Sequence, residues 1–230
     1  MKKNKILVPS PAAHKFALHK QGPIVLNIVL TDLSHDDAED NTAGLAQNIY
    51  YGKISDVMTF PAPVVDDSAG NGNLADLVTI SSNIVMKSGK VMQKIYITLE
   101  EAELNGKLQG EIDGKSYMNG ITFLHPGSKA AVLGFAQWSK NADLFFIVQE
   151  ADGQRRILGH PAYPAKASDG DLTTGKKSAD RKGNTFTFQS ARKGPCPIFT
   201  GKIQLTGSGV GSGTVDANAD GYQDLFYSGS

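Results

Sequence analysis

The feature that most restricts the fold is the spacing of turn signals along residues 77–205, where short apolar runs alternate with turn-forming dipeptides. Asp113-Gly114 and Asp152-Gly153 favour tight hairpins, because Asp and Gly tolerate the positive φ angles that such turns need. The runs between the turns have the length of strands and are rich in Val, Ile, Thr and Phe. With 25 glycines in 230 residues, the composition also suits short strands joined by tight turns. The pattern predicts a mostly β fold.

Two of the expected strands carry the clearest signals. The run at 143–150 has consecutive apolar residues, which is typical of a strand covered on both faces. The run at 184–190 alternates, which places Phe186 and Phe188 on one face. The full set of expected strands is 23–31, 78–85, 94–100, 107–112, 116–124, 143–150, 155–159, 184–190 and 197–205.

One α-helix is expected over residues 129–141. Ser128 precedes it and can cap the first turn through its hydroxyl. Ala131, Phe135 and Trp138 have the spacing i, i+4, i+7, which predicts that they form the buried face.

The remaining segments divide the chain into three parts. Residues 1–22 are basic and lack periodicity, so we expect an N-terminal arm. Residues 23–205 form a β-rich domain with a long acidic insertion at 32–73, and loops of that length usually serve a function or are disordered. Residues 206–230 form a C-terminal extension that begins with a Gly- and Ser-rich segment.

Charge is balanced overall but not along the chain. The 23 basic and 23 acidic residues give no reason to expect nucleic acid or a membrane as partner. Eight carboxylates and one lysine, Lys53, lie between residues 32 and 67, whereas six basic residues and one acidic residue, Asp180, lie between residues 176 and 193. The two segments are either complementary contacts between copies or separate solvated loops. The candidate contact residues are Asp36, Asp37, Glu39, Asp40, Lys176, Lys177, Arg181 and Lys182.

The single cysteine, Cys196, excludes an intramolecular disulfide and favours folding in a reducing compartment. The first residues lack the apolar core of a signal peptide, and no apolar run approaches the roughly 18 residues of a membrane-spanning helix. We therefore expect a cytoplasmic site of assembly and no membrane partner.

A possible cation site lies near the C-terminus, in the sequence DANADGYQDL at 216–225. Oxygen ligands at positions one, three, five, seven and nine, with Gly at six for the turn, can surround Ca²⁺. The loop resembles the nine-residue calcium loop of FG-GAP or integrin-type repeats, and an Asp- and Gly-rich turn without a metal is the alternative. The candidate ligands are Asp216, Asn218, Asp220, Tyr222 and Asp224.

No arrangement of residues calls for catalysis. The segment 170–177 nearly matches a phosphate-binding loop, but Lys177 replaces the required Ser or Thr and no apolar strand precedes it. The five histidines have no metal-binding spacing, and Cys196 has no neighbouring histidine to activate it. We expect no catalytic residues and no cofactor other than Ca²⁺.

Residues 94–205 resemble the major tail-tube proteins of bacteriophages, particularly those of Bacteroidetes phages. The resemblance rests on IYITLEEAELNGKLQGEIDGKSYMNGITFLHPG, LGFAQWSKNADLFFIVQEADGQRRILG and TTGKKSADRKGNTFTFQS. It implies two packed antiparallel sheets, a sandwich or half-barrel, flanked by one helix with a long inserted loop.

The same resemblance implies a virion protein that assembles in the bacterial host cytoplasm. Its partners would be copies of itself and other virion proteins, in hexameric rings that stack into a tube. DNA would pass through the tube without specific binding. The alternatives are a neck, collar or capsid-associated protein, the tube of a contractile secretion system, or a calcium-dependent binding or adhesion module.

Overall fold

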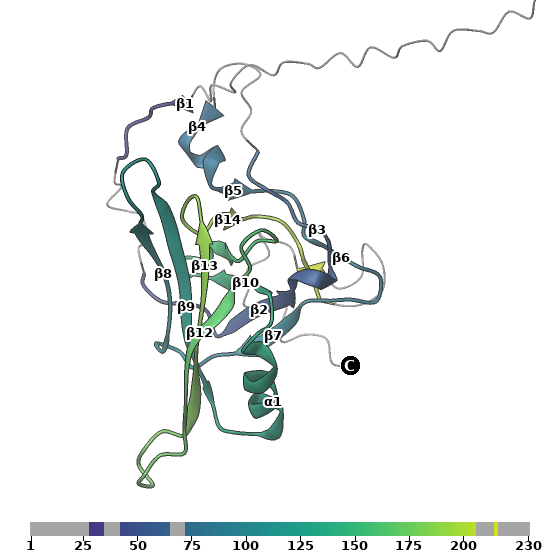
Figure 1. Ribbon diagram of the computed structural model, residues 1–230, viewed down its shortest axis with the longest axis vertical. Coiled ribbons are helices and arrows are strands. Elements are labelled where there is room, and N and C mark those ends of the chain that lie inside the picture. The colour runs from purple at the N-terminus through teal and green to yellow at the C-terminus, as the bar shows by residue number, and fades with distance from the viewer. Residues whose placement is uncertain (1–27, 35–41, 65–71, 206–213, 216–230) are drawn as a thin grey trace, which may run out of the picture.

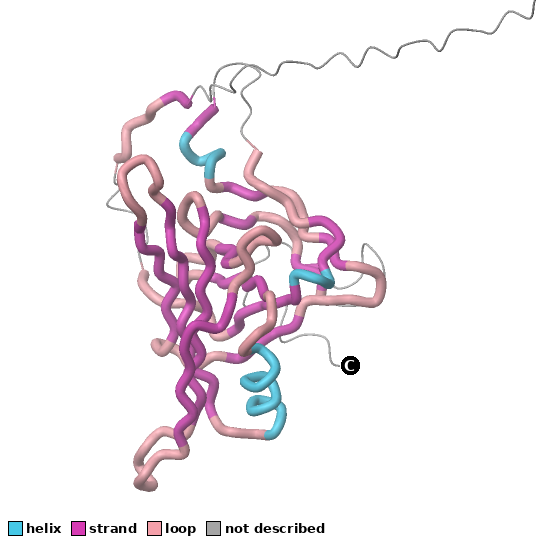
Figure 2. The backbone as a smooth tube through the Cα atoms, viewed as in Figure 1, coloured by secondary structure: helices cyan, strands magenta, loops and turns pink. Residues whose placement is uncertain are grey.

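The computed structural model describes residues 28–34, 42–64, 72–205 and 214–215 (Figures 1 and 2). The expected N-terminal arm, the acidic contact residues at 36–40 and the calcium loop lie outside these ranges. Within them the protein is mostly β with one α-helix, as the sequence predicts. No helix in these ranges is both long enough and apolar enough to span a membrane.

The larger sheet has six strands, and β10 and β2 lie inside it. All its neighbouring strands are antiparallel except β14 and β5, which are parallel. In spatial order the strands are β5 (Thr79–Ile80), β14 (Ile198–Phe199), β11 (Arg155–Leu158), β10 (Leu144–Gln149), β2 (Asn48–Lys53) and β7 (Gln93–Tyr96).

The smaller sheet has four longer, antiparallel strands. In spatial order they are β12 (Lys166–Thr173), β13 (Gly183–Arg192), β9 (Ser116–Pro126) and β8 (Ala102–Gln109). Three two-stranded pairs complete the β structure: β1 (Ile28–Val29) with β4 (Gly72–Asn73), β3 (Val57–Thr59) with β6 (Val85–Met86), and β15 (Ile203–Gln204) with β16 (Thr214–Val215). The short 3-10 helices are η1 (Ile54–Asp56) and η2 (Leu74–Leu77).

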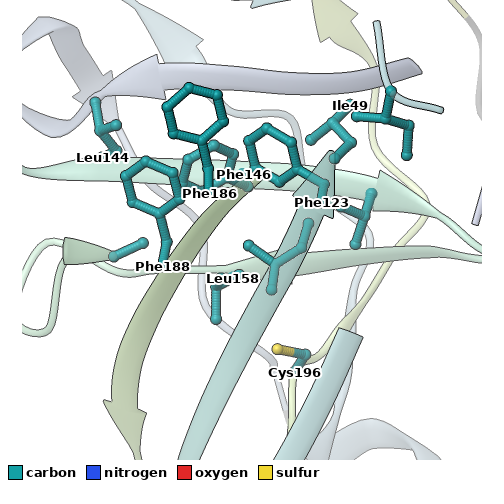
Figure 3. Close-up of a cluster of buried hydrophobic side chains, with 12 residues drawn as sticks. Ile49, Phe123, Leu144, Phe146, Leu158, Phe186, Phe188 and Cys196 are labelled. Carbon is teal, nitrogen blue, oxygen red and sulfur yellow. The ribbon is translucent and has the colours of Figure 1, made fainter. Parts of the chain in front are cut away.

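The two large sheets pack face to face around an aromatic cluster (Figure 3). Phe146 of β10 lies 4.7 Å from Phe188 of β13 between ring centroids, and Phe123 of β9 lies 6.3 Å from Phe146. A second cluster covers the other face of the six-stranded sheet, where Phe145 and Ile147 of β10 are fully buried. The sequence prediction that β10 is covered on both faces is therefore confirmed.

Helix α1 (Ala130–Ser139) packs against the first cluster beside the β12–β13 hairpin (Figure 1). Phe135 is the central contact, with its ring 5.3 Å from that of Tyr51 and 5.4 Å from that of Phe186. The predicted helix is confirmed, but its expected buried face is wrong in part. Ala131 is exposed and Trp138 is 46% exposed, because Val132 and Ala136 point inward together with Phe135.

The start of the helix also differs from the prediction. Lys129 is the N-cap residue, and no side chain caps the first turn. The expected role of the Ser128 hydroxyl is therefore wrong.

Four strand predictions need correction. The expected insertion at 32–73 contains β2, which pairs with both β10 and β7 in the six-stranded sheet. The polar segment that forms β12 was expected to be a loop, but it pairs with β13 along its length. The expected strands at 78–85 and 197–205 are each divided into two short strands, which belong to different sheets.

Candidate assembly surface

The four-stranded sheet has two open edges. Among the described residues, β8 pairs only with β9 and β12 pairs only with β13. The outer backbone N–H and C=O groups of an edge strand can pair with another strand, and natural proteins usually cover or interrupt such edges. Because the sheet is antiparallel throughout, β8 and β12 run in opposite directions. The two edges therefore have the polarity needed to form one more antiparallel ladder.

The strand register separates an apolar face from a polar face. Phe188 lies opposite Ile121, and Phe186 lies opposite Phe123, so these four side chains face the six-stranded sheet. The alternate positions face outward, because successive side chains of a strand point to opposite sides. Members of the outward set are Glu103, Asn105, Lys107, Gly120, Thr122, Thr185, Thr187, Gln189, Asp169 and Asp171.

The outward face is mostly polar and carries three carboxylates and two lysines, Lys107 and Lys166. Thr122 and Thr187 lie opposite each other at its centre and share a hydrogen bond of 3.1 Å between their hydroxyl oxygens. Glu103 on β8 and Asp169 on β12 lie in the same row at the two edges, and Asp171 lies further along β12. The sequence alone could predict these outward residues only if the inward residues of each strand were already known.

The β12–β13 hairpin projects beyond α1 and ends in a basic tip, residues 174–182 (Figure 1). The Asp180 carboxylate accepts backbone N–H bonds from Lys176 and Lys177, each 2.8 Å long. This carboxylate therefore holds the turn, while the side chains of both lysines are exposed and form no ion pair with any described residue. Lys182 at the end of the tip is also exposed.

The base of this hairpin is fixed to the rest of the protein. The Asn184 side chain, 1% exposed, donates a hydrogen bond to the backbone carbonyl of Gly127. The backbone N–H of Gly127 in turn donates to the carbonyl of Lys182 over 3.0 Å. Arg181 forms an ion pair with Glu101, and both side chains are well exposed, so this pair contributes little to stability. The basic tip is thus held in a defined position by buried hydrogen bonds.

The turn between β8 and β9 lies at the opposite end of the sheet (Figure 1). Asp113 adopts φ +66°, but β8 ends at Gln109 and not at Ile112, so the turn covers residues 110–115 and is longer than the expected tight Asp-Gly turn. Ile112 is 84% exposed. Glu111 and Asp113 give this turn two exposed carboxylates, and the Lys115 ammonium donates to the carbonyl of Gly110 over 2.7 Å. The two ends of the sheet therefore carry different charges.

The predicted site residues are only partly described. The structure places Lys176, Lys177, Arg181 and Lys182 together at the basic tip. The predicted contacts Asp36, Asp37, Glu39 and Asp40 lie outside the described residues, so their pairing with the tip stays a prediction. The same holds for the calcium ligands Asp216, Asn218, Asp220, Tyr222 and Asp224. Within the described ranges, no group of three or more His, Cys, Asp or Glu side chains is arranged to hold a metal.

The segment that nearly matches a phosphate-binding loop has a different structure. Gly170 and Thr173 belong to β12, and the chain continues through the hairpin turn into β13. A phosphate-binding loop needs a helix N-terminus after the glycine-rich turn, and this segment has none.

Cys196 is buried and belongs to the first hydrophobic cluster, where it lies apart from the aromatic rings (Figure 3). Burial raises the pKa of its thiol to about 12, and the positive charges of Arg156 and Arg192 only partly oppose that shift. The thiol is therefore neutral at pH 8.

We expect native protein at pH 8 to react with a thiol-alkylating reagent at least about a hundredfold more slowly than guanidinium-unfolded protein, because alkylation requires an accessible thiolate. Mass spectrometry reports the modification directly, since the chain has one cysteine. Equal rates in the two conditions would contradict the described burial.

Comparison with protein families, curated proteins and solved structures finds no match to this chain.

Proposed function

We propose that the protein is a structural subunit of a phage tail tube, which assembles with copies of itself into closed rings. The observation that carries this proposal is the pair of open edges on the four-stranded sheet. Strand β8 of one copy would pair with strand β12 of the next. An even number of antiparallel strands in each copy keeps the alternation of direction unbroken around the ring.

The β12 edge is suited to this pairing over part of its length. A register shift between Ala167 and Asp169 interrupts the pairing of β12 with β13 near the start of β12. The strand is therefore regular only from Asp169 to Thr173. A β-bulge locally bends a strand and disrupts pairing. The contact with a neighbouring copy would therefore be centred on the part of β12 nearest the basic tip.

The outward face of the sheet would line the lumen of the ring. Its side chains are small or polar at the centre. Toward the edges, the three carboxylates of Glu103, Asp169 and Asp171 outnumber the two ammonium groups of Lys107 and Lys166. Binding to DNA depends mainly on basic groups that neutralise phosphates, whereas carboxylates repel them. Such a lumen would let DNA pass without holding it.

The charge difference between the two ends of the sheet supports stacking of rings. The basic tip of one copy would meet the Glu111 and Asp113 end of a copy in the next ring. Contacts between different surfaces of the same subunit propagate head to tail and form filaments. In this proposal the protein acts in the virion, assembles in the host cytoplasm and has other virion proteins as its further partners.

Negative-stain microscopy and sedimentation velocity of the full-length protein test the proposal. We expect rings and tubes whose abundance rises with protein concentration. Rings that never stack would favour a neck, collar or capsid-associated protein instead. A monomer at every concentration would contradict self-assembly and would favour the calcium-dependent module.

A matched pair of proline variants, Asp171→Pro and Leu172→Pro, tests the β12 edge specifically. Backbone N–H groups of consecutive residues in a strand point to opposite sides, so one of these positions faces β13 and the other faces the open edge. Proline removes the N–H group in each case. We expect one variant to lose thermal stability, and the other to keep its melting temperature but form no rings. Normal rings formed by the stable variant would show that the open edge of β12 is not part of the contact between copies.

A further inference from the structure

A cavity of about 420 Å³ lies beside Arg192, the last residue of β13. This end of β13 is the one away from the basic tip (Figure 1). Its polar lining residues are Arg192, Lys193, His160 and Tyr163, and Leu77, Val78 and Pro197 contribute apolar walls. None of the described residues that line it carries a carboxylate. We propose that this cavity is a binding site for a small oxyanion, a carboxylate or a phosphate, held by Arg192.

The Arg192 guanidinium has no partner for its charge among the described residues. Its Nη1 atom is inaccessible to solvent and forms no hydrogen bond. The neighbouring Cys196 thiol provides no negative charge, because burial raises its pKa to about 12. Arg192 as a whole is partly exposed, so the unfavourable desolvation is that of one nitrogen without a hydrogen-bond partner. Nη1 is closed off from the cavity as well as from solvent, so an oxyanion in the cavity would pair with the charge of Arg192 through the accessible part of the guanidinium.

A nearby arginine shows the usual solution to the same problem. Arg156 of β11 forms an ion pair with Glu150 over 3.0 Å and donates to the backbone carbonyl of Cys196 over 3.1 Å. Glu150 is thus engaged by Arg156, and it lines other pockets of the protein. The contrast between the two arginines indicates that the partner of Arg192 comes from outside the described chain.

His160 can add a second donor to this site. The backbone N–H of Ala162 donates to His160 Nδ1 over 3.1 Å, so in the neutral ring the proton is on Nε2. Burial, together with the positive charge of Arg192, lowers the pKa of His160 below its ordinary value. The ring is fixed edge-on to Phe60, with 5.4 Å between centroids. A neutral Nε2–H group and the exposed ammonium of Lys193 would then complement Arg192 around an oxyanion.

Both carboxylate and phosphate match the paired N–H groups of a guanidinium, which bind planar oxyanions through two parallel hydrogen bonds. Isothermal titration calorimetry with sodium phosphate and with sodium acetate, at constant ionic strength in chloride, distinguishes the two. Saturable binding of one ion per chain is expected for at least one probe. Heat with phosphate alone would identify a phosphate site, and heat with acetate would identify a carboxylate site. No saturable binding of either probe would overturn the proposal.

Variants locate the binding. Arg192→Met should lower the affinity for the bound probe at least tenfold, whereas Arg192→Lys should retain part of that affinity. Arg181→Met is the matched control, because it removes an exposed arginine at the basic tip, and it should bind the probe as the unaltered protein does. Equal affinity in Arg192→Met and the unaltered protein would mean an adventitious ion only.

Thermal unfolding in chloride gives a second measurement that needs no ligand. If Arg192 lacks a partner, Arg192→Met should melt at the same or a higher temperature than the unaltered protein, because the variant removes an unpaired charge. A marked fall in melting temperature would show that the guanidinium already has a partner within the chain, and would overturn the proposal. Neither measurement depends on ring formation, so the anion site and the proposed assembly can fail separately.

Discussion

Replacing Gly159 with alanine is expected to lower the free energy of unfolding by about 3 kcal/mol or more, through backbone strain combined with a steric clash. Gly159 has φ +95°, and an added Cβ would lie 2.7 Å from the carbonyl oxygen of Leu144 and 3.0 Å from the Cα of Phe145. These are backbone atoms of β10. They cannot move freely, because Leu144 and Ala165 exchange two backbone hydrogen bonds, of 3.1 and 2.8 Å, where the two large sheets meet.

Gly153→Ala is the matched control for this change. Gly153 has a similar φ of +88°, but a Cβ added there would meet no atom within 4 Å. Its loss of stability should therefore report the left-handed conformation alone, about 1 kcal/mol. Urea denaturation followed by circular dichroism measures both variants. Equal losses would show that the contact with β10 relaxes without cost, contrary to the expected clash.

Reversing one charge at the basic tip should weaken the proposed stacking of rings while leaving the fold of the subunit intact. Lys177→Glu places a carboxylate where the proposed contact meets Glu111 and Asp113 of the next ring. Like charges in a contact destabilise it, and we expect the concentration needed for tube formation to rise about tenfold or more. Tube formation is measured by light scattering and electron microscopy across a series of protein concentrations.

Lys53→Glu makes the same change of net charge at the end of β2. Lys53, like Lys177, is exposed and has no ion pair among the described residues. It should leave tube formation unchanged, and both variants should keep the melting temperature of the unaltered protein. An equal effect of the two substitutions would indicate that total charge matters and not the tip. Added salt should weaken stacking in the unaltered protein, because it screens exposed charges.

Local sequence patterns were sufficient to predict some of the strands and the helix. The unbroken apolar run predicted β10, the alternation of Phe186 and Phe188 predicted β13, and the Asp113-Gly114 dipeptide predicted the hairpin of β8 and β9. In each case the signal is contained within the element itself. The helix was also predictable, but its buried face was not, because nearly every side chain in it is apolar or small.

Elements defined by distant partners were not predictable in this way. Strand β2 lies in an acidic, turn-rich region and exists through pairing with β10 and β7. Strand β12 is polar and is stabilised by its ladder with β13, so its sequence has the character of a loop. The position of Arg192 was missed for the same reason. In sequence it belongs to a basic segment, and only the register of β13 places it at a cavity.

The place of β9 in the four-stranded sheet has a consequence for biosynthesis. One neighbour, β8, is made immediately before β9, whereas the other, β13, follows only after α1, β10, β11 and β12. As the chain leaves the ribosome, the long strand β9 can therefore pair with β8 while its other edge stays unpaired and Ile121 and Phe123 stay uncovered. Exposed apolar strands of this kind are prone to join other chains before folding is complete. If the protein assembles as proposed, a slow supply of the second half of the chain would favour aggregation over ring formation.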